Sequence, residues 1–231
     1  MADFIHHLLF GIYPYIALAV LAVGSVIRYD REPYSWRAGS SQLLRRKQLI
    51  VGSVLFHAGV LMIFAGHVVG LLTPIAIWDA LGVPHGAKQL LAMVAGGLAG
   101  VMAIIGATML IHRRFGDPRV RAASSFSDNL VILLLWMQLA LGLGTIPVSA
   151  QHLDGHEMVK FMEWAQGIFT FRAGSAELIR DVALVFKLHL LLGLTILLLF
   201  PFTRLVHMLS APVRYIWRPG YQVVRSRKLA A

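Results

Sequence analysis

Five long stretches of this chain carry almost no charge, and they constrain its fold more than any other feature. Each has the roughly 20 apolar residues that a helix needs to cross a bilayer at about 1.5 Å of rise per residue. A segment in lipid must satisfy its backbone hydrogen bonds internally, so these stretches predict helices. They cover residues 4–27, 48–73, 89–111, 129–149 and 182–210. The sequence therefore predicts an all-α, polytopic membrane protein, in which residues 1–231 form one domain, a bundle of five transmembrane helices.

The composition agrees with a membrane protein and narrows its chemistry. The chain is 58% hydrophobic and 14% charged, whereas soluble domains carry about 25% charged residues. It has no cysteine, which excludes disulfides, thiolate-bound iron–sulfur clusters and covalently attached haem. The first apolar stretch lacks a basic start and has full spanning length, so we expect a retained helix rather than a cleavable signal.

The Lys and Arg residues predict the orientation of the bundle. The connections after the first and third stretches, together with the segment from residue 204, carry 16 of them, and the opposite side carries 4. Because cytoplasmic loops are enriched in Lys and Arg, we expect the N-terminus outside and the C-terminus in the cytoplasm. The net charge of +10 then reflects topology and contact with anionic lipid. We also expect the basic end, residues 204–231, to contact partner subunits, and we expect no nucleic-acid binding.

Four histidines lie within two of the predicted helices, where an ionisable group is usually functional: His57 and His67 in the second, His189 and His207 in the fifth. These helices run in opposite directions. At about 1.5 Å per residue, His67 and His189 lie roughly 9 and 10 Å from the outer boundary, and His57 and His207 roughly 15 and 10 Å from the inner one. This favours pairing His67 with His189 and His57 with His207. The spacing of 18 residues also predicts that His189 and His207 point the same way on one continuous helix.

Two histidine pairs at two depths suit two bis-histidine haems. Zinc would require four ligands clustered at one depth, and the alternative that stays open is a proton relay or polar contacts between helices. Two haems would form an electron path across the membrane, with a lipid-soluble quinol as the natural donor. Lys88 is the only cation at the outer start of the third stretch. It either binds a quinol oxygen or marks the helix end by extending to the interface.

The segment 157–171 is apolar with scattered charges. This pattern predicts a short helix lying in the outer interface, with Trp164 as its anchor. Such a helix would either cover a binding site or simply connect the fourth and fifth spans.

Short motifs spread over nearly the whole chain resemble those of a known family. They are Ile12-Tyr13-Pro14-Tyr15, Arg28-Tyr29-Asp30, Leu55-Phe56-His57, Gly66-His67, Ser149-Ala150-Gln151-His152, Leu188-His189, Phe200-Pro201-Phe202 and Arg204-Leu205-Val206-His207. With these motifs the sequence resembles the gamma subunit of respiratory, membrane-bound nitrate reductase, a dihaem cytochrome b.

The resemblance implies roles for six residues. His67 and His189 would bind the iron of a distal haem near the outer face, and His57 and His207 that of a proximal haem near the inner face. Lys88 would assist quinol binding beside the distal haem. Gly66 would line the same quinol pocket.

The resemblance also implies the function. Menaquinol or ubiquinol would be oxidised near the outer face of a bacterial or archaeal cytoplasmic membrane, with protons released outside. Electrons would pass through two b haems to an iron–sulfur beta subunit and a molybdenum alpha subunit on the cytoplasmic face, where nitrate is reduced. The alternatives are the same module serving another molybdenum oxidoreductase, a haem-free proton-relay transporter, and a purely structural anchor.

Overall fold

The computed structural model describes residues 1–36, 41, 44–210 and 217. Five of its helical segments are long and apolar enough to cross a membrane: Ala2–Arg31, Arg46–Leu72, His85–Gly116, Phe126–Ser149 and Leu184–Phe202. Within these described ranges there is no β-strand. The predicted all-α bundle of five spanning helices is therefore confirmed. Of the predicted partner-contacting end, residues 204–231, only 204–210 and 217 belong to the described part.

The first span contains a π-helical turn, Leu8–Ile12, between α1 (Ala2–His7) and α2 (Tyr13–Arg31), with Pro14 in the first turn of α2. The other α-helices are α3 (Arg46–Leu72), α4 (Ile75–Ala80), α5 (His85–Gly116), α6 (Pro118–Ala122), α7 (Phe126–Ser149), α8 (His156–Phe169) and α9 (Leu184–Leu199). Short 3-10 helices are η2 (Pro33–Ser35), η3 (Ser175–Ile179), η4 (Phe200–Phe202) and η5 (Arg204–Ser210).

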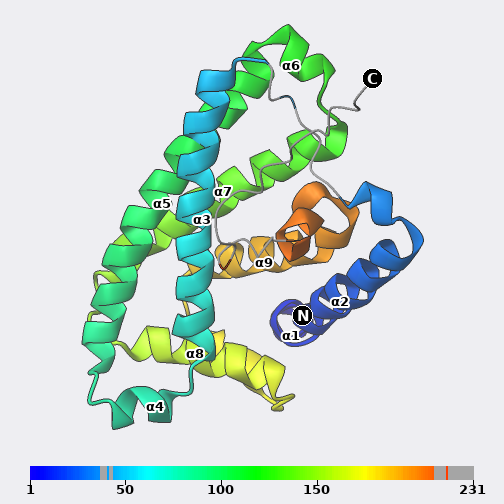
Figure 1. Ribbon diagram of the computed structural model, residues 1–231. Helices are drawn as coiled ribbons and strands as arrows, with labels where there is room; N and C mark the ends of the chain where they lie inside the picture. The colour runs from blue at the N-terminus through cyan, green and yellow to red at the C-terminus, as the bar shows by residue number, and fades with distance from the viewer. Residues whose placement is uncertain (37–40, 42–43, 211–216, 218–231) are drawn as a thin grey trace, which may run out of the picture.

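The five spans pack in the order α3, α5, α7, α9, α2. The helices α3 and α5 lie side by side and antiparallel, joined by α4 at one end, and α8 lies across that same end (Figure 1). We call this the α8 end and the opposite one, where α6 lies, the α6 end. The spans α3, which carries His57 and His67, and α9, which carries His189, are not closely packed against each other in the described structure.

Small residues allow α3 to lie close to α5. A Cβ atom added to Gly59 would lie 2.6 Å from the carbonyl oxygen of Ala99 and 2.7 Å from the amide of Ala103. One added to Gly106 would lie 2.7 Å from the carbonyl oxygen of Gly52. In lipid, where no hydrophobic force drives helices together, such close backbone packing is a main source of association. The contact fixes which side of α3 remains free.

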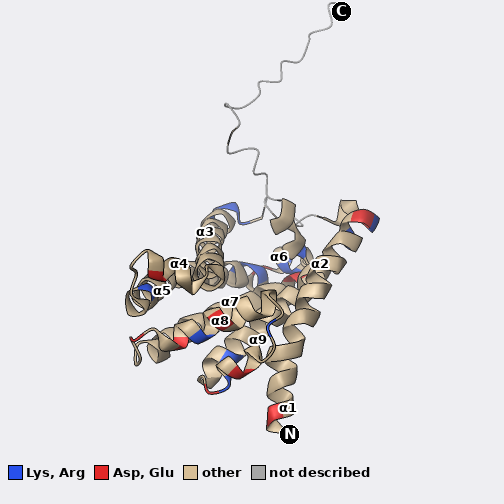
Figure 2. Cartoon of the chain, turned by 90° about the horizontal axis from the view of Figure 1, so that it is seen from below, with Lys and Arg blue, Asp and Glu red and all other residues tan. Residues whose placement is uncertain are grey.

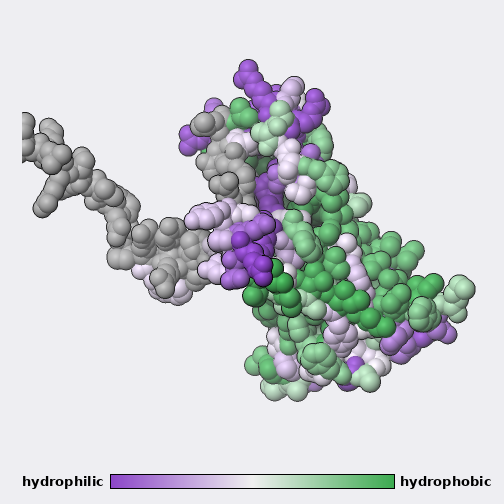
Figure 3. Space-filling view, turned by 90° about the vertical axis from the view of Figure 1, so that its right-hand side faces the viewer, coloured by the Kyte–Doolittle hydropathy of each residue, from purple (hydrophilic) through white to green (hydrophobic). Residues whose placement is uncertain are grey.

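Charged and apolar residues occupy different parts of the bundle surface. Figure 2 shows Lys, Arg, Asp and Glu mainly at helix ends, on α8 and in connections. Figure 3 shows a broad hydrophobic surface over one face, with hydrophilic residues at its upper end, beside the grey atoms and at its lower right edge. Large exposed side chains on the spans are apolar, for example Leu61 and Leu98. This is the arrangement that a lipid-embedded bundle requires.

The fifth span differs from the prediction of one helix over residues 182–210. The α-helix ends at Leu199, and His207 lies on the separate 3-10 helix η5. The prediction that His189 and His207 share one face of a continuous helix is therefore wrong. Pro201 has no N–H to donate to the carbonyl one turn back, so it cannot continue the α-helix. Arg28 satisfies the carbonyls freed by the break, donating to Pro201 O at 2.7 Å and Thr203 O at 2.8 Å.

The contact between α3 and α5 can be tested with Gly106→Ala, which should lower the free energy of unfolding by about 1–3 kcal/mol because the new methyl group overlaps the backbone of α3. The measurement is the thermal unfolding midpoint of the purified protein in detergent. Gly96→Ala on the same helix is the matched control, since its Cβ would meet nothing within 4 Å. Equal midpoints for the two variants would contradict the close packing.

Candidate functional site

The first histidine pair, His67 on α3 and His189 on α9, lies nearer the α8 end of the bundle. The ring centroids of His67 and His189 are 6.2 Å apart, with an interplanar angle of 44°. His67 is exposed in the polypeptide and His189 is half-buried. The two rings therefore face each other across a short interval, although their helices are not closely packed.

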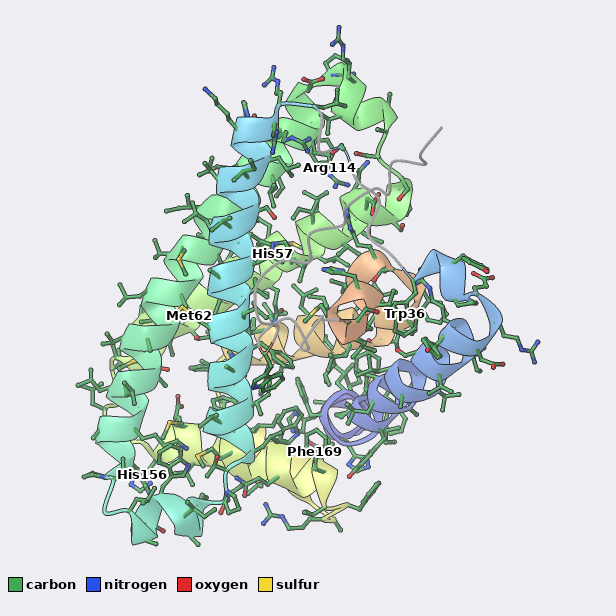
Figure 4. All side chains as sticks on the ribbon, viewed as in Figure 1. Trp36, His57, Met62, Arg114, His156 and Phe169 are labelled. Carbon is green, nitrogen blue, oxygen red and sulfur yellow. The ribbon has the colours of Figure 1, made fainter. Side chains whose placement is uncertain are left out.

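The second pair lies nearer the α6 end and joins α3 to η5. The ring centroids of His57 and His207 are 6.3 Å apart, with an interplanar angle of 70°. His57 projects from the side of α3 that faces the middle of the molecule (Figure 4). The structure thus brings together the two pairs expected from chain direction, even though His207 reaches its place from a separate helix.

Backbone carbonyls orient three of the four rings through Nδ1. His57 Nδ1 lies 2.8 Å from Ser53 O, His67 Nδ1 lies 2.8 Å from Ile63 O, and His207 Nδ1 lies 2.5 Å from Arg204 O. A carbonyl can only accept, so Nδ1 carries the proton and Nε2 keeps a free lone pair. Metal-binding histidines in proteins show this pattern, because the second hydrogen bond fixes both tautomer and orientation.

His189 is held differently. The side-chain Nε2 of Gln138, on α7, donates to His189 O at 3.1 Å and lies 3.5 Å from the ring nitrogen Nε2. The ring packs on Gly142, where a Cβ would lie 2.9 Å from its Cε1 atom. Its Nδ1 is buried without a hydrogen-bond partner among the described residues. A glycine at 142 is therefore needed to seat this ring against α7.

The two pairs fit haem iron. With a metal–nitrogen bond of about 2.0–2.1 Å and about 1.1 Å from ring nitrogen to ring centre, two imidazoles on opposite sides of one metal have centroids about 6.2–6.4 Å apart. A Cβ on Gly66 or Gly70 would meet nothing within 4 Å, which leaves open space on the side of α3 next to the Lys88 contact. Among the residues described, no three His, Cys, Asp or Glu side chains gather into one metal site. Separate pairs of histidine ligands suit haem better than zinc, which takes four ligands.

Lys88 is buried rather than extended to the interface. Only 5% of it is exposed, and its Nζ donates to Gly70 O at 3.0 Å and contacts Met162 Sδ at 2.7 Å. The ring centroid of Trp78 is 4.6 Å away, within cation–π range. Gly70 lies one turn beyond His67 on α3, so the ammonium group lies at the same end of the bundle as the His67–His189 pair.

The helix α8 covers this end of the site. Met162 on α8 touches Lys88, and Gln166 donates to Leu71 O at 3.0 Å and Thr73 O at 3.1 Å, capping the end of α3. Of the two interpretations of the segment 157–171, a helix that covers a site therefore fits the structure better. Trp164 is not a lipid anchor as expected, because it is buried and its indole N–H donates to Phe10 O at 3.0 Å.

Ion pairs tie the N-terminal helix to the connection before α9. The Arg180 side chain pairs with Asp3 and with Glu177. Its hydrogen bond lowers the pKa of the Glu177 carboxyl. His6 adds a hydrogen bond to Ala176 O at 2.8 Å. These contacts position η3 and hence the start of α9, which carries His189.

Sequence reasoning missed three residues of this site: Trp78, Gln138 and Met162. Gln138 carries a weak signal, since it lies four residues before Gly142 on one face of an apolar helix. Trp78 and Met162 reach Lys88 from separate elements, and no local pattern marks them.

Known proteins resemble this chain over nearly its whole length. The chain matches the family described as "Nitrate reductase gamma subunit" over residues 6–227. It is 51% identical over 228 residues to "Respiratory nitrate reductase 2 gamma chain" of Escherichia coli (strain K12), covering 99% of this chain and 100% of that one. It is 38% identical over 222 residues to "Nitrate reductase gamma chain" of Bacillus subtilis (strain 168), covering 95% and 98%. The chain therefore belongs to the nitrate reductase gamma subunit family and is a multi-pass bacterial membrane subunit of a nitrate-reducing enzyme complex.

Proposed function

We propose that this chain is the quinol-oxidising, dihaem cytochrome b subunit of its complex. The observation that carries the proposal is the presence of two histidine pairs at two levels, with ring centroids 6.2 and 6.3 Å apart. The excess of Lys and Arg at the α6 end supports an orientation with this end and the C-terminus in the cytoplasm and the N-terminus outside.

In this proposal each histidine pair holds one b haem. His67 and His189 bind the distal haem iron near the outer face, and His57 and His207 bind the proximal haem iron near the inner face. The carbonyls of Ser53, Ile63 and Arg204 orient three of these ligands. Bound haems supply one-electron transfer, and the protein contributes ligation, depth and access.

Lys88 and Gly66 form the proposed quinol site. The Lys88 ammonium already donates to Gly70 O, so it can donate to a quinol oxygen placed beside it, and the charge-assisted bond would orient the head group. Gly66 lies beside open space one turn from Gly70, where a side chain would intrude on a flat ring. Menaquinol and ubiquinol both fit this chemistry.

The direction of charge movement follows from the topology. Quinol oxidation near the outer face releases protons outside, and electrons move inward to the cytoplasmic face. There the basic surface at the α6 end and the segment 204–231 would contact an iron–sulfur beta subunit, with a molybdenum alpha subunit beyond it reducing nitrate. The proposed location is the bacterial cytoplasmic (inner) membrane.

Replacing the ligands one at a time tests the pairing. His67→Ala or His189→Ala should abolish quinol oxidation and remove one b haem, and His57→Ala or His207→Ala should remove the other, because a haem loses half of its axial ligation. The measurement is haem content and the reduced-minus-oxidised spectrum of the purified complex. His152→Ala, an exposed histidine of a connection, is the control. Loss of the same haem from His57→Ala and His189→Ala would contradict the pairing.

Lys88→Ala tests the quinol site separately. Losing a charge-assisted hydrogen bond of about 1.5–3 kcal/mol should lower kcat/KM for quinol by about 10- to 150-fold. Both haems should remain in the spectrum, since Lys88 binds neither iron. Steady-state quinol oxidation by the complex gives the comparison, with Lys160→Ala on α8 as the control. An unchanged kcat/KM would exclude Lys88 from quinol binding.

A further inference from the structure

A second polar pair lies beside the Lys88 site. Asp79 on α4 and His85, the first residue of α5, are joined through Asp79 Oδ1 and His85 Nε2 at 2.9 Å. Their side chains are 57% and 35% exposed, respectively. The pair therefore reaches the surface at the α8 end, and the functions proposed above do not use it.

The covalent chain places this pair next to the contacts of Lys88. Asp79 directly follows Trp78, whose ring lies 4.6 Å from Lys88 Nζ. His85 precedes Lys88 by three residues on α5, so the two side chains share one face of the helix at about 5–6 Å between Cβ atoms. The indole N–H of Trp78 is buried and has no partner in the described part of the chain. A buried ammonium and a partly exposed carboxylate–imidazole pair thus lie within one helical turn of each other on α5.

Oxidation of a quinol at Lys88 creates a proton-transfer problem. Each quinol gives one quinone, two electrons and two protons. Lys88 is 5% exposed and, as an ammonium, has no lone pair to accept a proton. A proton acceptor that also reaches water is required. Histidine suits this role, because its ordinary charge change falls between pH 5 and 8.

We propose that the Asp79–His85 pair is the proton-release group of the quinol site. This inference rests on the proposed function. The two electrons enter the inward path, and the two protons pass one at a time to His85. With Nε2–H donating to Asp79, the lone pair of Nδ1 accepts the proton. The Asp79 carboxylate stabilises the resulting imidazolium, which then gives its proton to the outer aqueous phase.

Other titratable groups lie on the elements that pack against His85. The start of α8 packs against it, since a Cβ on Gly155 would lie 2.6 Å from His85 Cβ, and Figure 4 shows His156 at this end of α8. The first turn of α8 also carries Glu157, whose Oε2 is buried without a partner among the described residues. The Asp79 carboxylate, in direct contact with the ring, stabilises an imidazolium at His85, whereas the Lys88 charge opposes it.

The test uses the intact nitrate reductase complex carrying His85→Asn or Asp79→Asn, with a soluble menaquinol analogue as the donor. His7→Asn, an exposed histidine of α1, is the matched control. Both test variants should keep the wild-type haem spectrum and KM, while kcat falls at least about tenfold, as for loss of a positioned acid–base group. In His85→Asn the acidic limb of the pH–kcat profile should disappear, and added imidazole should restore kcat.

Three results would overturn the proposal: a wild-type kcat and pH profile in His85→Asn, a loss of kcat that imidazole does not restore, or an equal loss in His7→Asn. A wild-type complex that lacks b haem or fails to oxidise the quinol would instead overturn the proposed function. The haem spectrum and wild-type rate, measured first, keep these two failures apart.

Discussion

The distance between facing histidine rings constrains how the helices of this bundle are arranged. At one level it sets the distance from α3 to α9, and at a second level the distance from α3 to η5, with nearly equal values of 6.2 and 6.3 Å. Each distance constrains the separation of α3 from one partner element. The small-residue contact with α5 holds α3 from another side, and both histidines of α3 stay exposed in the polypeptide. The helix α3 can therefore serve as a rigid support for both pairs.

The break in the fifth span places His207 on η5, opposite His57. A helix ending in or near lipid leaves carbonyls that need donors. Arg28 provides them from the end of α2, and its other donors bond Ser35 at 2.9 and 3.1 Å. The guanidinium thus joins the first span, the first connection and the segment leading to His207. The position of His207 relative to α3 therefore depends on this side chain as well as on the helices.

The five spans and the choice of histidine pairs followed from hydropathy and chain direction, because both are encoded locally or by simple geometry. The break at Pro201 could also have been predicted, since the missing N–H is a local signal that hydropathy alone hides. Trp164 was different. Aromatic residues of amphipathic segments usually lie at the membrane interface, whereas this one bonds a carbonyl 154 residues away. Contacts over such separations leave no periodic pattern in a single sequence.

The donors of Lys88 are only partly used by strong hydrogen-bond acceptors. Burying an ammonium is costly unless its donors are used. Gly70 O is a strong acceptor, but the thioether of Met162 is a weak one, and the Trp78 ring contributes only a cation–π contact. The charge is therefore held without being fully satisfied. In the proposed quinol site, a quinol oxygen is a better acceptor than sulfur, so exchange of Met162 for the quinol would strengthen the bonding of the ammonium. The incompletely used donors of Lys88 would thus favour binding of the proposed quinol.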